Sequence, residues 1–465
     1  MGKITFFGGI CEIGGNKILL EDGDTSVFLD FGMSFREHGQ YFEEYLKPRT
    51  ANGFGDFLEL RLIPWMEGIY RKDLLSISKL PEHDEPVVDG VLLSHMHLDH
   101  SSYISFLDEN IPVYCSDVSR TMAQALIDCG TRSMVKEICN YKERPIKPGC
   151  KPVCRTLKKE KEFSIGNLTV KAFPVDHSVP GSLAYLIYAP EGVLVYTGDL
   201  RLHGTENSQT QQSIEKIKDE TEKVDVLLCE GTNVGSGIEN SEKDVETNSN
   251  KVVSKTEQLV IADFSCKDVT RLNTFLEVAK ANDRKLGICL KDVCLYKLLK
   301  KVVPNLPSID DSDIIIFKPK MKTGRYANTD YPKCLRDFLN LENTKDAAYI
   351  HEHQSELILC MGFYEINHLV DVKPNPGSVY IHSSSEAFNE EMRIDEERLN
   401  NWLDHFELQK NHFHASGHAG ACDLKEIIED LKPKKVVPIH TEKPELFKCL
   451  TSNSVLVEKG GSIAF

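Results

Sequence analysis

The chain of 465 residues lacks an apolar run long enough to cross a bilayer, and no basic stretch followed by an apolar one opens it. It also lacks a CxxC pair among its 14 cysteines, the nearest approach being Cys150 and Cys154. These absences predict a cytoplasmic protein with no membrane partner, whose cysteines are mostly small buried thiols. A structural zinc at Cys150 and Cys154 is the alternative for that pair.

Positive charge is scarce as well. The 55 Lys and Arg residues face 71 Asp and Glu residues, which gives a net charge of −16. Proteins that bind nucleic acid are usually basic, so the overall balance argues against a polyanionic partner. Residues 284–336 are an exception, with twelve Lys or Arg against five Asp. That stretch is either a solvated charged face or a groove that follows phosphates.

The remaining composition, 41% hydrophobic and 27% charged, is that of a globular protein with two or three domains. Short strands alternate with helices in the first part of the chain, which predicts an α/β sandwich. A βαβα pattern begins near residue 259 and predicts a second domain with a parallel sheet. Between them the polar stretch 237–257 has no apolar period, so we expect an exposed flexible loop there.

Aromatic residues are unusually frequent between residues 31 and 80, where they alternate with charged ones. Aromatic side chains supply large buried areas, so packing against the core is the first interpretation of this region. The alternative is that some of them line a substrate channel.

The run His95-Met96-His97-Leu98-Asp99-His100 is the most informative motif. It follows the apolar segment Val91–Ser94, which is typical of a strand, and it opens a predicted helix at 101–107. Residues at i and i+2 of a loop can point the same way, and the next Asp and His then fall on a first helical turn. Four ligands bunched so closely cannot all surround one tetrahedral ion, which favours two adjacent metal ions. The alternative is a polar surface loop that happens to be rich in histidine.

Four more segments place metal-ligand residue types at the ends of predicted strands. They contain Asp30, His177, Asp199 and His440. Any one of these residues alone is more often a hydrogen-bonded structural residue. Their joint occurrence with the histidine motif is what predicts a metal centre.

In this order, the motifs resemble those of the metallo-β-lactamase fold, and the resemblance covers essentially the full chain. The segments Cys229–Asn233, His414–Ala419 and Pro438–Glu442 are similar to those of β-CASP nucleases. The opening Gly8–Asn16 adds a similarity to the ribonuclease J family in a short, archaeal-type form. The resemblance implies an αββα metallo-β-lactamase sandwich (1–204 and 378–465) with an inserted α/β β-CASP domain at 205–377.

The resemblance also implies the roles of the site residues. One zinc ion is expected on His95, His97 and His177, and a second on Asp99, His100 and His440, with Asp199 bridging them; Mn²⁺ is the alternative metal. Asp30 is expected to orient a ligand. The predicted catalytic residues are Asp99, His418 and Glu230, with His418 as the proton donor. A phosphate-binding site is expected at His414, Ser416 and Gly417.

The function implied is a metal-dependent ribonuclease that hydrolyses RNA phosphodiesters with two metals. It would act 5′→3′ on 5′-monophosphate ends of single-stranded RNA, with endonucleolytic cleavage as a second mode and a homodimer as the assembly. The alternatives are a DNA-directed β-CASP nuclease of the repair type, a small-molecule metallo-hydrolase and a catalytically inactive scaffold. All seven ligand positions are intact, which argues against the scaffold.

Overall fold

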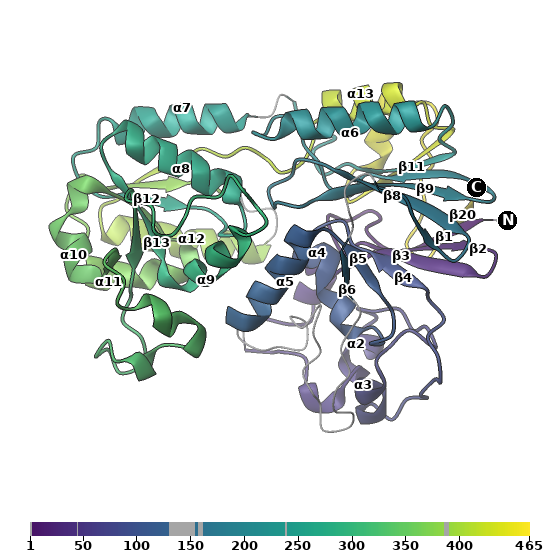
Figure 1. Cartoon of the computed structure of the whole chain (residues 1–465), viewed down its shortest axis with the longest axis horizontal. Coiled ribbons are helices and arrows are strands. Elements are labelled where there is room, and N and C mark those ends of the chain that lie inside the picture. The colour runs from purple at the N-terminus through teal and green to yellow at the C-terminus, as the bar shows by residue number, and fades with distance from the viewer. Residues whose placement is uncertain (1, 44, 130–153, 157–160, 238–239, 386–389) are drawn as a thin grey trace.

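The computed structural model describes residues 2–43, 45–129, 154–156, 161–237, 240–385 and 390–465. Cys150 lies outside these residues, and with it the predicted zinc at Cys150 and Cys154. Two sheets packed face to face form one unit of the molecule, and a third sheet forms a second unit beside it (Figure 1).

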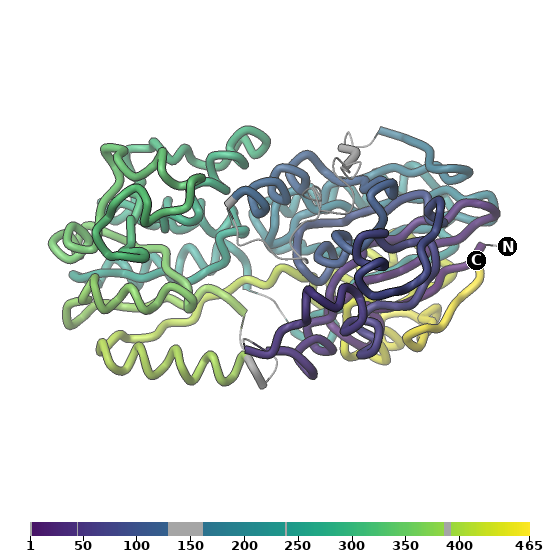
Figure 2. Tube along the Cα trace, turned by 90° about the horizontal axis from the view of Figure 1, so that it is seen from below, coloured from purple at the N-terminus to yellow at the C-terminus, as the bar shows by residue number. Residues whose placement is uncertain are grey.

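The first sheet has the strand order β20-β1-β2-β3-β4-β5-β6. Its strands β3 to β6 are parallel to one another. Its strands are β1 (Lys3–Gly8), β2 (Lys17–Asp22), β3 (Thr25–Phe31), β4 (Gly90–Leu92), β5 (Val113–Cys115), β6 (Cys154–Thr156) and β20 (Ser462–Ala464). Strand β20 pairs with β1, so the two ends of the chain lie together (Figure 2).

The second sheet has the order β19-β11-β10-β9-β8-β7. Its strands are β7 (Phe163–Ile165), β8 (Leu168–Pro174), β9 (Leu183–Ala189), β10 (Gly192–Tyr196), β11 (Val226–Glu230) and β19 (Lys435–Ile439). Strand β11 runs parallel to both β10 and β19, although some 200 residues separate it from β19. The chain therefore leaves this sheet and returns to it at neighbouring strands.

Apolar side chains of the two sheets meet in one layer, which includes Ile18, Leu29, Tyr185 and Ile187. Helices α6 (Asn207–Glu220), α13 (Ala421–Leu431) and α14 (Phe447–Leu450) cover the outer face of the second sheet. Helices α2 (Gly55–Glu59), α3 (Lys72–Ile77), α4 (Leu98–Ser101) and α5 (Asp117–Cys129) lie over the first (Figure 1). The αββα sandwich expected from the sequence is thus confirmed.

The aromatic region 31–80 divides in two. Phe54, Phe57 and Tyr70 are buried in the core, as expected for packing. Phe35, which begins α1 (Phe35–Gly39), and Tyr45 are exposed. Core packing therefore accounts for only part of this region.

The third sheet is entirely parallel, in the order β15-β14-β13-β16-β12-β17-β18. Its strands are β12 (Val260–Asp263), β13 (Lys285–Cys289), β14 (Ile314–Phe317), β15 (Thr344–Lys345), β16 (Leu357–Cys360), β17 (Val379–His382) and β18 (Gln409–His412). One face packs against α7 (Glu242–Val253), α8 (Val269–Ala281) and α9 (Leu290–Leu299). The other face packs against α10 (Ala347–Glu352), α11 (Leu369–Val372) and α12 (Glu390–His405). The predicted parallel-sheet domain is present.

The expectation of a flexible loop at 237–257 is wrong, because most of that stretch forms helix α7. Ser241 caps it in a reciprocal capping box with Asp244. Val245, Ser249 and Val253 repeat every fourth residue on its buried face. This narrow stripe, with a serine in its middle, is too weakly apolar to stand out in so polar a sequence.

The domain limits at 204 and 377 stay a prediction. Sheet membership favours different limits, because β11 belongs to the second sheet while β17 and β18 belong to the third sheet. We therefore propose that the inserted unit extends from α7 at Glu242 to the end of β18 at His412.

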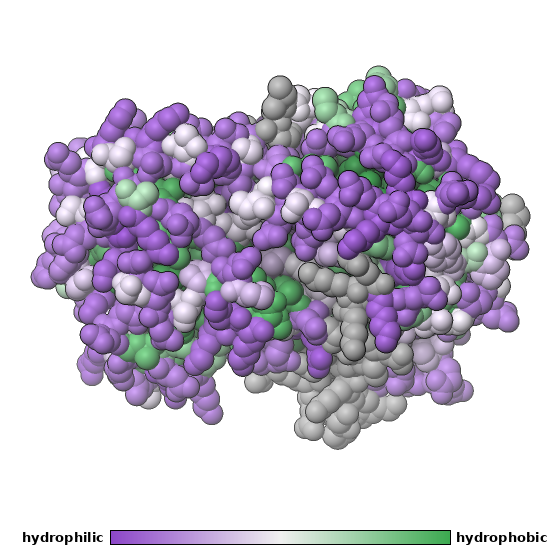
Figure 3. Space-filling model, turned by 45° about the horizontal axis from the view of Figure 1, so that its top comes forward, coloured by the Kyte–Doolittle hydropathy of each residue, from purple (hydrophilic) through white to green (hydrophobic). Residues whose placement is uncertain are grey.

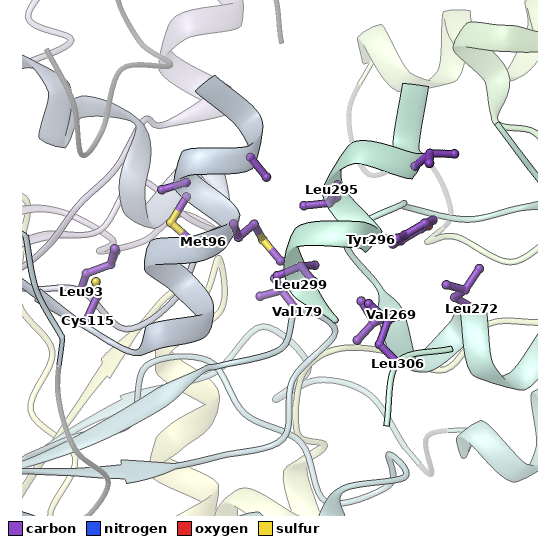
Figure 4. Packing of buried hydrophobic residues seen from close by; sticks show 14 of the residues in the cluster. Leu93, Met96, Cys115, Val179, Val269, Leu272, Leu295, Tyr296, Leu299 and Leu306 are labelled. Atoms are coloured by element: carbon purple, nitrogen blue, oxygen red, sulfur yellow. The ribbon is translucent and has the colours of Figure 1, made fainter. Parts of the chain in front are cut away.

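A continuous apolar seam joins the two units. Helix α5 contacts α9, and Met96 of the lactamase unit faces Leu299 of the inserted unit (Figure 4). The coloured residues on the face that Figure 3 shows are mostly hydrophilic. The basic stretch 284–336 is not one uniform face, because Arg284 is buried while Lys291 and Lys320 pair with Glu365 and Asp371.

Candidate metal centre

The histidine motif lies in the loop between β4 and α4. Met96 packs into the apolar seam, while His95 on one side of it is fully buried and His97 on the other caps α4. Asp99 and His100 follow within α4, on its first turn, as the sequence predicted. The helix expected at 101–107 is instead a 3₁₀ turn at Ser102–Phe106.

Three imidazoles form the first ligand group, which we call the imidazole set: His95, His97 and His177. His97 Nδ1 lies 3.1 Å from His95 Nε2 and 3.0 Å from His177 Nε2. The edge of a tetrahedron around zinc, with bonds of about 2.0–2.1 Å to nitrogen, is about 3.3 Å. The spacing of the three nitrogens is therefore close to that of ligands on one ion.

The second group, the carboxylate set, consists of Asp99, His100 and His440. Asp99 Oδ2 lies 3.1 Å from His440 Nε2 and 3.8 Å from His100 Nε2. Asp199 stands between the two sets. Its Oδ2 lies 3.6 Å from His95 Nε2 in one set and 3.1 Å from His100 Nε2 in the other.

Asp30 supports the carboxylate set through its contact with His100. Its Oδ2 lies 2.7 Å from His100 Nδ1 and accepts hydrogen bonds from the hydroxyls of Ser94 and Tyr196. Because Nδ1 faces Asp30, it is Nε2 of His100 that points to the centre and would bind a cation. Asp30 has φ +56°, a left-handed conformation that few residues other than glycine adopt. Strain of this kind is typical of functional sites.

The other imidazoles are oriented by partners that the sequence analysis did not identify. His177 Nδ1 bonds the Gly417 carbonyl, and His440 Nδ1 lies 2.7 Å from the Thr232 hydroxyl. His95 Nδ1 lies 3.0 Å from Ser94 Oγ. Thr232 lies two residues after the predicted Glu230, but its partner His440 is 208 residues away. No local signal in the sequence connects them.

Three buried polar atoms at the centre have no hydrogen-bond partner among the described residues: His100 Nε2, Asp199 Oδ1 and His418 Nδ1. Leaving buried polar groups unpaired is costly. A cation at the centre would satisfy the first two, and nitrogen with carboxylate oxygen is a donor set suited to zinc. The residues present therefore fit the metals that the fold implies.

Burial lowers the pKa of His95 and His177 well below the usual value, and it lowers that of His97 to about 3. These rings are thus neutral ligands. His100 differs, because the carboxylates of Asp199, Asp99 and Asp30 outweigh burial and raise its pKa. The two sets therefore offer a cation different electrostatic surroundings.

His418 and Glu230 lie together beside the metal centre, as predicted for a pair. His418 Nδ1 is 3.5 Å from Glu230 Oε2 and 3.9 Å from Asp199 Oδ2. Burial lowers the pKa of His418, but the carboxylates of Glu230 and Asp199 outweigh it and raise the pKa to about 9. Glu230 is fully buried and accepts the backbone N–H groups of Ala419 and Thr232.

The segment predicted to bind phosphate, His414 to Gly417, runs between the two units. Ser416 Oγ accepts a hydrogen bond from Asn233 Nδ2 and one from the His418 N–H. A Cβ atom at Gly417 would lie 2.7 Å from Ser178 Oγ and 2.9 Å from His177 Cε1, so a side chain here would displace one or both. His414 Nδ1 lies 3.4 Å from the Ser383 carbonyl oxygen.

A separate cavity of about 430 Å³ lies at the carboxyl edge of the third sheet. Asp263, Cys289, Cys360 and His382, at the ends of four adjacent strands, line it. None of the residues predicted from the sequence for the site is among its lining residues.

Comparison with known proteins agrees with this geometry. Residues 68–239 match the beta-lactamase superfamily domain, and residues 405–448 match the Zn-dependent metallo-hydrolase RNA specificity domain. Ribonuclease J of Mycoplasma genitalium is 23% identical over 457 residues, which cover 95% of this chain and 68% of that protein. This chain is ribonuclease J-like over 95% of its length.

Ribonuclease J 1 of Streptococcus pyogenes is similar to this ribonuclease J-like chain to the same degree, 23% identical over 94% of the chain and 68% of the relative. Ribonuclease J of Helicobacter pylori is 21% identical, and there the match covers 56% of the relative. A crystal structure of a protein of unknown function from Enterococcus faecalis has the same fold, with a TM-score of 0.74, 22% identity and full coverage of both chains.

None of the helices in the described part of the chain has the length and apolar composition that a bilayer crossing requires.

Proposed function

We propose that the chain is a metal-dependent ribonuclease that hydrolyses RNA phosphodiester bonds with two Zn²⁺ ions. The observation that carries the proposal is the position of Asp199 Oδ2, between 3.1 and 3.8 Å from imidazole nitrogens of both ligand sets. One carboxylate placed in this way can serve two ions at once. The ribonuclease J relatives support RNA as the substrate.

The imidazole set would hold one ion, the carboxylate set the other, and Asp199 would bridge them; Mn²⁺ is the alternative metal. When bound, paired divalent cations supply Lewis acidity for activating water and for neutralising charge on a phosphodiester. Asp30, the Thr232 hydroxyl and the Gly417 carbonyl each contact the Nδ1 atom of one imidazole, in His100, His440 and His177. These contacts orient the three rings so that their Nε2 atoms would be the ligands.

His418 is the proposed proton donor to the departing oxygen, with the Glu230 carboxylate 3.5 Å from its Nδ1. His418 Nδ1 lies 3.9 Å from Oδ2 of Asp199, one of the residues that would hold the ions. A donor next to the leaving oxygen fits the general-acid role of an imidazole. The products would carry 5′-phosphate and 3′-hydroxyl ends.

We propose further that His414, Ser416 and Gly417 bind a phosphate next to the scissile one. A terminal 5′-monophosphate held there would place the first internucleotide bond on the metals, which gives 5′→3′ exonucleolytic cleavage. Endonucleolytic cleavage would be a second mode. The proposed substrate is single-stranded RNA and the proposed assembly a homodimer, while the cytoplasmic location stays a prediction.

The deciding experiment uses single-stranded RNA with a 5′-monophosphate and a 5′ label, the matching DNA, and the His97→Ala variant. We expect release of labelled mononucleotide from RNA alone, dependent on added Zn²⁺ or Mn²⁺ and lost in the variant. Equal cutting of DNA would favour a repair-type nuclease, and internal fragments alone would favour an endonuclease. No cleavage with either metal would contradict the proposal and favour a small-molecule hydrolase.

A further inference from the structure

A buried network of charged residues crosses the junction between the two units. Its centre is Glu242, the first residue of α7, whose side chain is almost fully buried. Glu242 Oε1 accepts hydrogen bonds from Arg271 Nη2 at 2.8 Å and from Arg201 Nη1 at 3.1 Å. Arg271 Nε bonds the second oxygen at 3.0 Å, so the Glu242–Arg271 contact is bidentate.

The two arginines come from different units and are both fully buried. Arg201 follows Asp199 in the lactamase unit, and its Nε bonds Asp176, the residue before the metal ligand His177. Arg271 lies on α8 of the inserted unit. Glu242 therefore links a helix of the inserted unit to the loop that carries His177.

The same arginines hold the backbone of the proposed phosphate site. Arg271 Nη1 bonds both the carbonyl and the hydroxyl of Ser383 at 2.6 Å, and its Nη2 bonds the Ala415 carbonyl at 3.3 Å. Arg201 Nη1 bonds the Ser416 carbonyl at 3.3 Å. The guanidinium groups of the two arginines thus fix three backbone carbonyls, those of Ser383, Ala415 and Ser416.

We propose that Glu242 and Arg271 are positioning residues, which hold Ser383 and the segment 414–417 in the conformation that binds the terminal phosphate of RNA. The inference rests on the proposed function and assigns part of its end recognition to two residues that need not touch substrate. Because a planar guanidinium fork makes contacts that an ammonium cannot, lysine at position 271 is not an equivalent replacement.

The test compares two kinds of substrate with the same enzyme. The first is RNA with either a 5′-phosphate or a 5′-hydroxyl end, and the second is bis(p-nitrophenyl) phosphate, a small diester that requires the metals alone. For Glu242→Gln and Arg271→Lys we expect the KM for 5′-phosphorylated RNA to rise about tenfold or more, since misplacing a binding group by 1 Å costs up to about 100-fold. Preference for the phosphorylated end should fall with it.

Hydrolysis of the small diester and bound metal per chain should stay within about twofold of the unmodified enzyme, a change too small to signal a lost ligand. Arg284→Lys is the matched control, because Arg284 is another buried arginine of the inserted unit and bonds the carbonyls of Gln258, Leu357 and Thr256. It should leave end preference unchanged.

Unchanged end preference in both variants would overturn the inference. Equal losses on RNA and on the small diester, together with lost metal, would also overturn it, since the network would then be purely structural. If Glu242→Gln does not fold, Arg271→Lys alone decides between these outcomes. An unmodified enzyme that cleaves the diester but no RNA would instead contradict the proposed function.

Discussion

The two ligand sets of the metal centre share Asp199 but differ in charge and support. The imidazole set consists of neutral rings whose pKa values are lowered by burial. The carboxylate set contains Asp99 and is backed by a second carboxylate, Asp30, behind His100. Oxygen ligands suit hard cations, and nitrogen ligands suit zinc. Two metal positions in one centre can therefore differ in both affinity and preferred metal.

The largest effect is expected where the two sets join. Asp199→Asn removes the charge that both ions would share, so bound metal should fall from two per chain to well below one. Loss of an essential electrostatic contact then lowers the hydrolysis rate by at least about 10³-fold. Metal analysis and single-turnover rates measure both quantities. Glu429→Gln, on the exposed face of α13, is the control and should change neither.

His97→Ala separates the sets. It removes one of three neutral ligands, so the imidazole set should empty while the carboxylate set keeps one ion. We expect the hydrolysis rate to fall by more than about 100-fold. Substitution of a residue that only supports a metal ligand costs up to about 100-fold, and loss of the ligand itself should cost more. Asp99→Asn should give the opposite occupancy, with the ion kept at the imidazole set. Loss of both ions in His97→Ala would mean that the sets are not independent.

Asp30→Asn tests the support of the carboxylate set. Asparagine tolerates the left-handed backbone, so the fold should persist while the charge behind His100 is lost. Affinity for one of two ions should fall about 10–100-fold, measured by titration with a competing chelator. Asp89→Asn, which removes a carboxylate bonded to the exposed Ser26 N–H, serves as control. Equal weakening at both positions would show that Asp30 stabilises the whole centre.

The smallest effect is expected for Thr232→Val. It removes the hydroxyl that bonds His440 Nδ1 and leaves the side-chain volume nearly unchanged. Affinity at the carboxylate set should fall about tenfold, near the lower end for such partners. Thr221→Val, which removes an exposed hydroxyl bonded to the Lys223 carbonyl, should leave metal affinity unchanged. An effect confined to the imidazole set would contradict the assignment of Thr232.

Much of this arrangement could be predicted from the sequence, because ligands occur at the ends of strands whose apolar alternation is plain. Residues 95–100 lie within six positions, so their closeness is local information. The partners that orient them are not local. Thr232 and His440 meet only because β11 and β19 are neighbours in one sheet.

The charged network was missed for a related reason. Glu242 lies in the polar stretch for which we expected a loop. Nothing nearby in the sequence indicates that its carboxylate pairs with an arginine 29 residues later. Helix α7 itself depends on a capping box and a narrow buried stripe. Such features become recognisable only when the neighbouring helix α8 is in place.

The apolar seam between the units bears on how the molecule unfolds. Interfaces between domains are usually polar enough to permit relative motion. Here Met96, Leu299 and their neighbours belong to one continuous core, so parting the units would expose buried hydrocarbon on both sides (Figure 4). The metal-ligand loop, which carries Met96 between two of its histidines, would lose its packing in the same event. Loss of the interface and loss of the metal centre are thus expected to be one cooperative transition, although the chain builds its sheets in separate units.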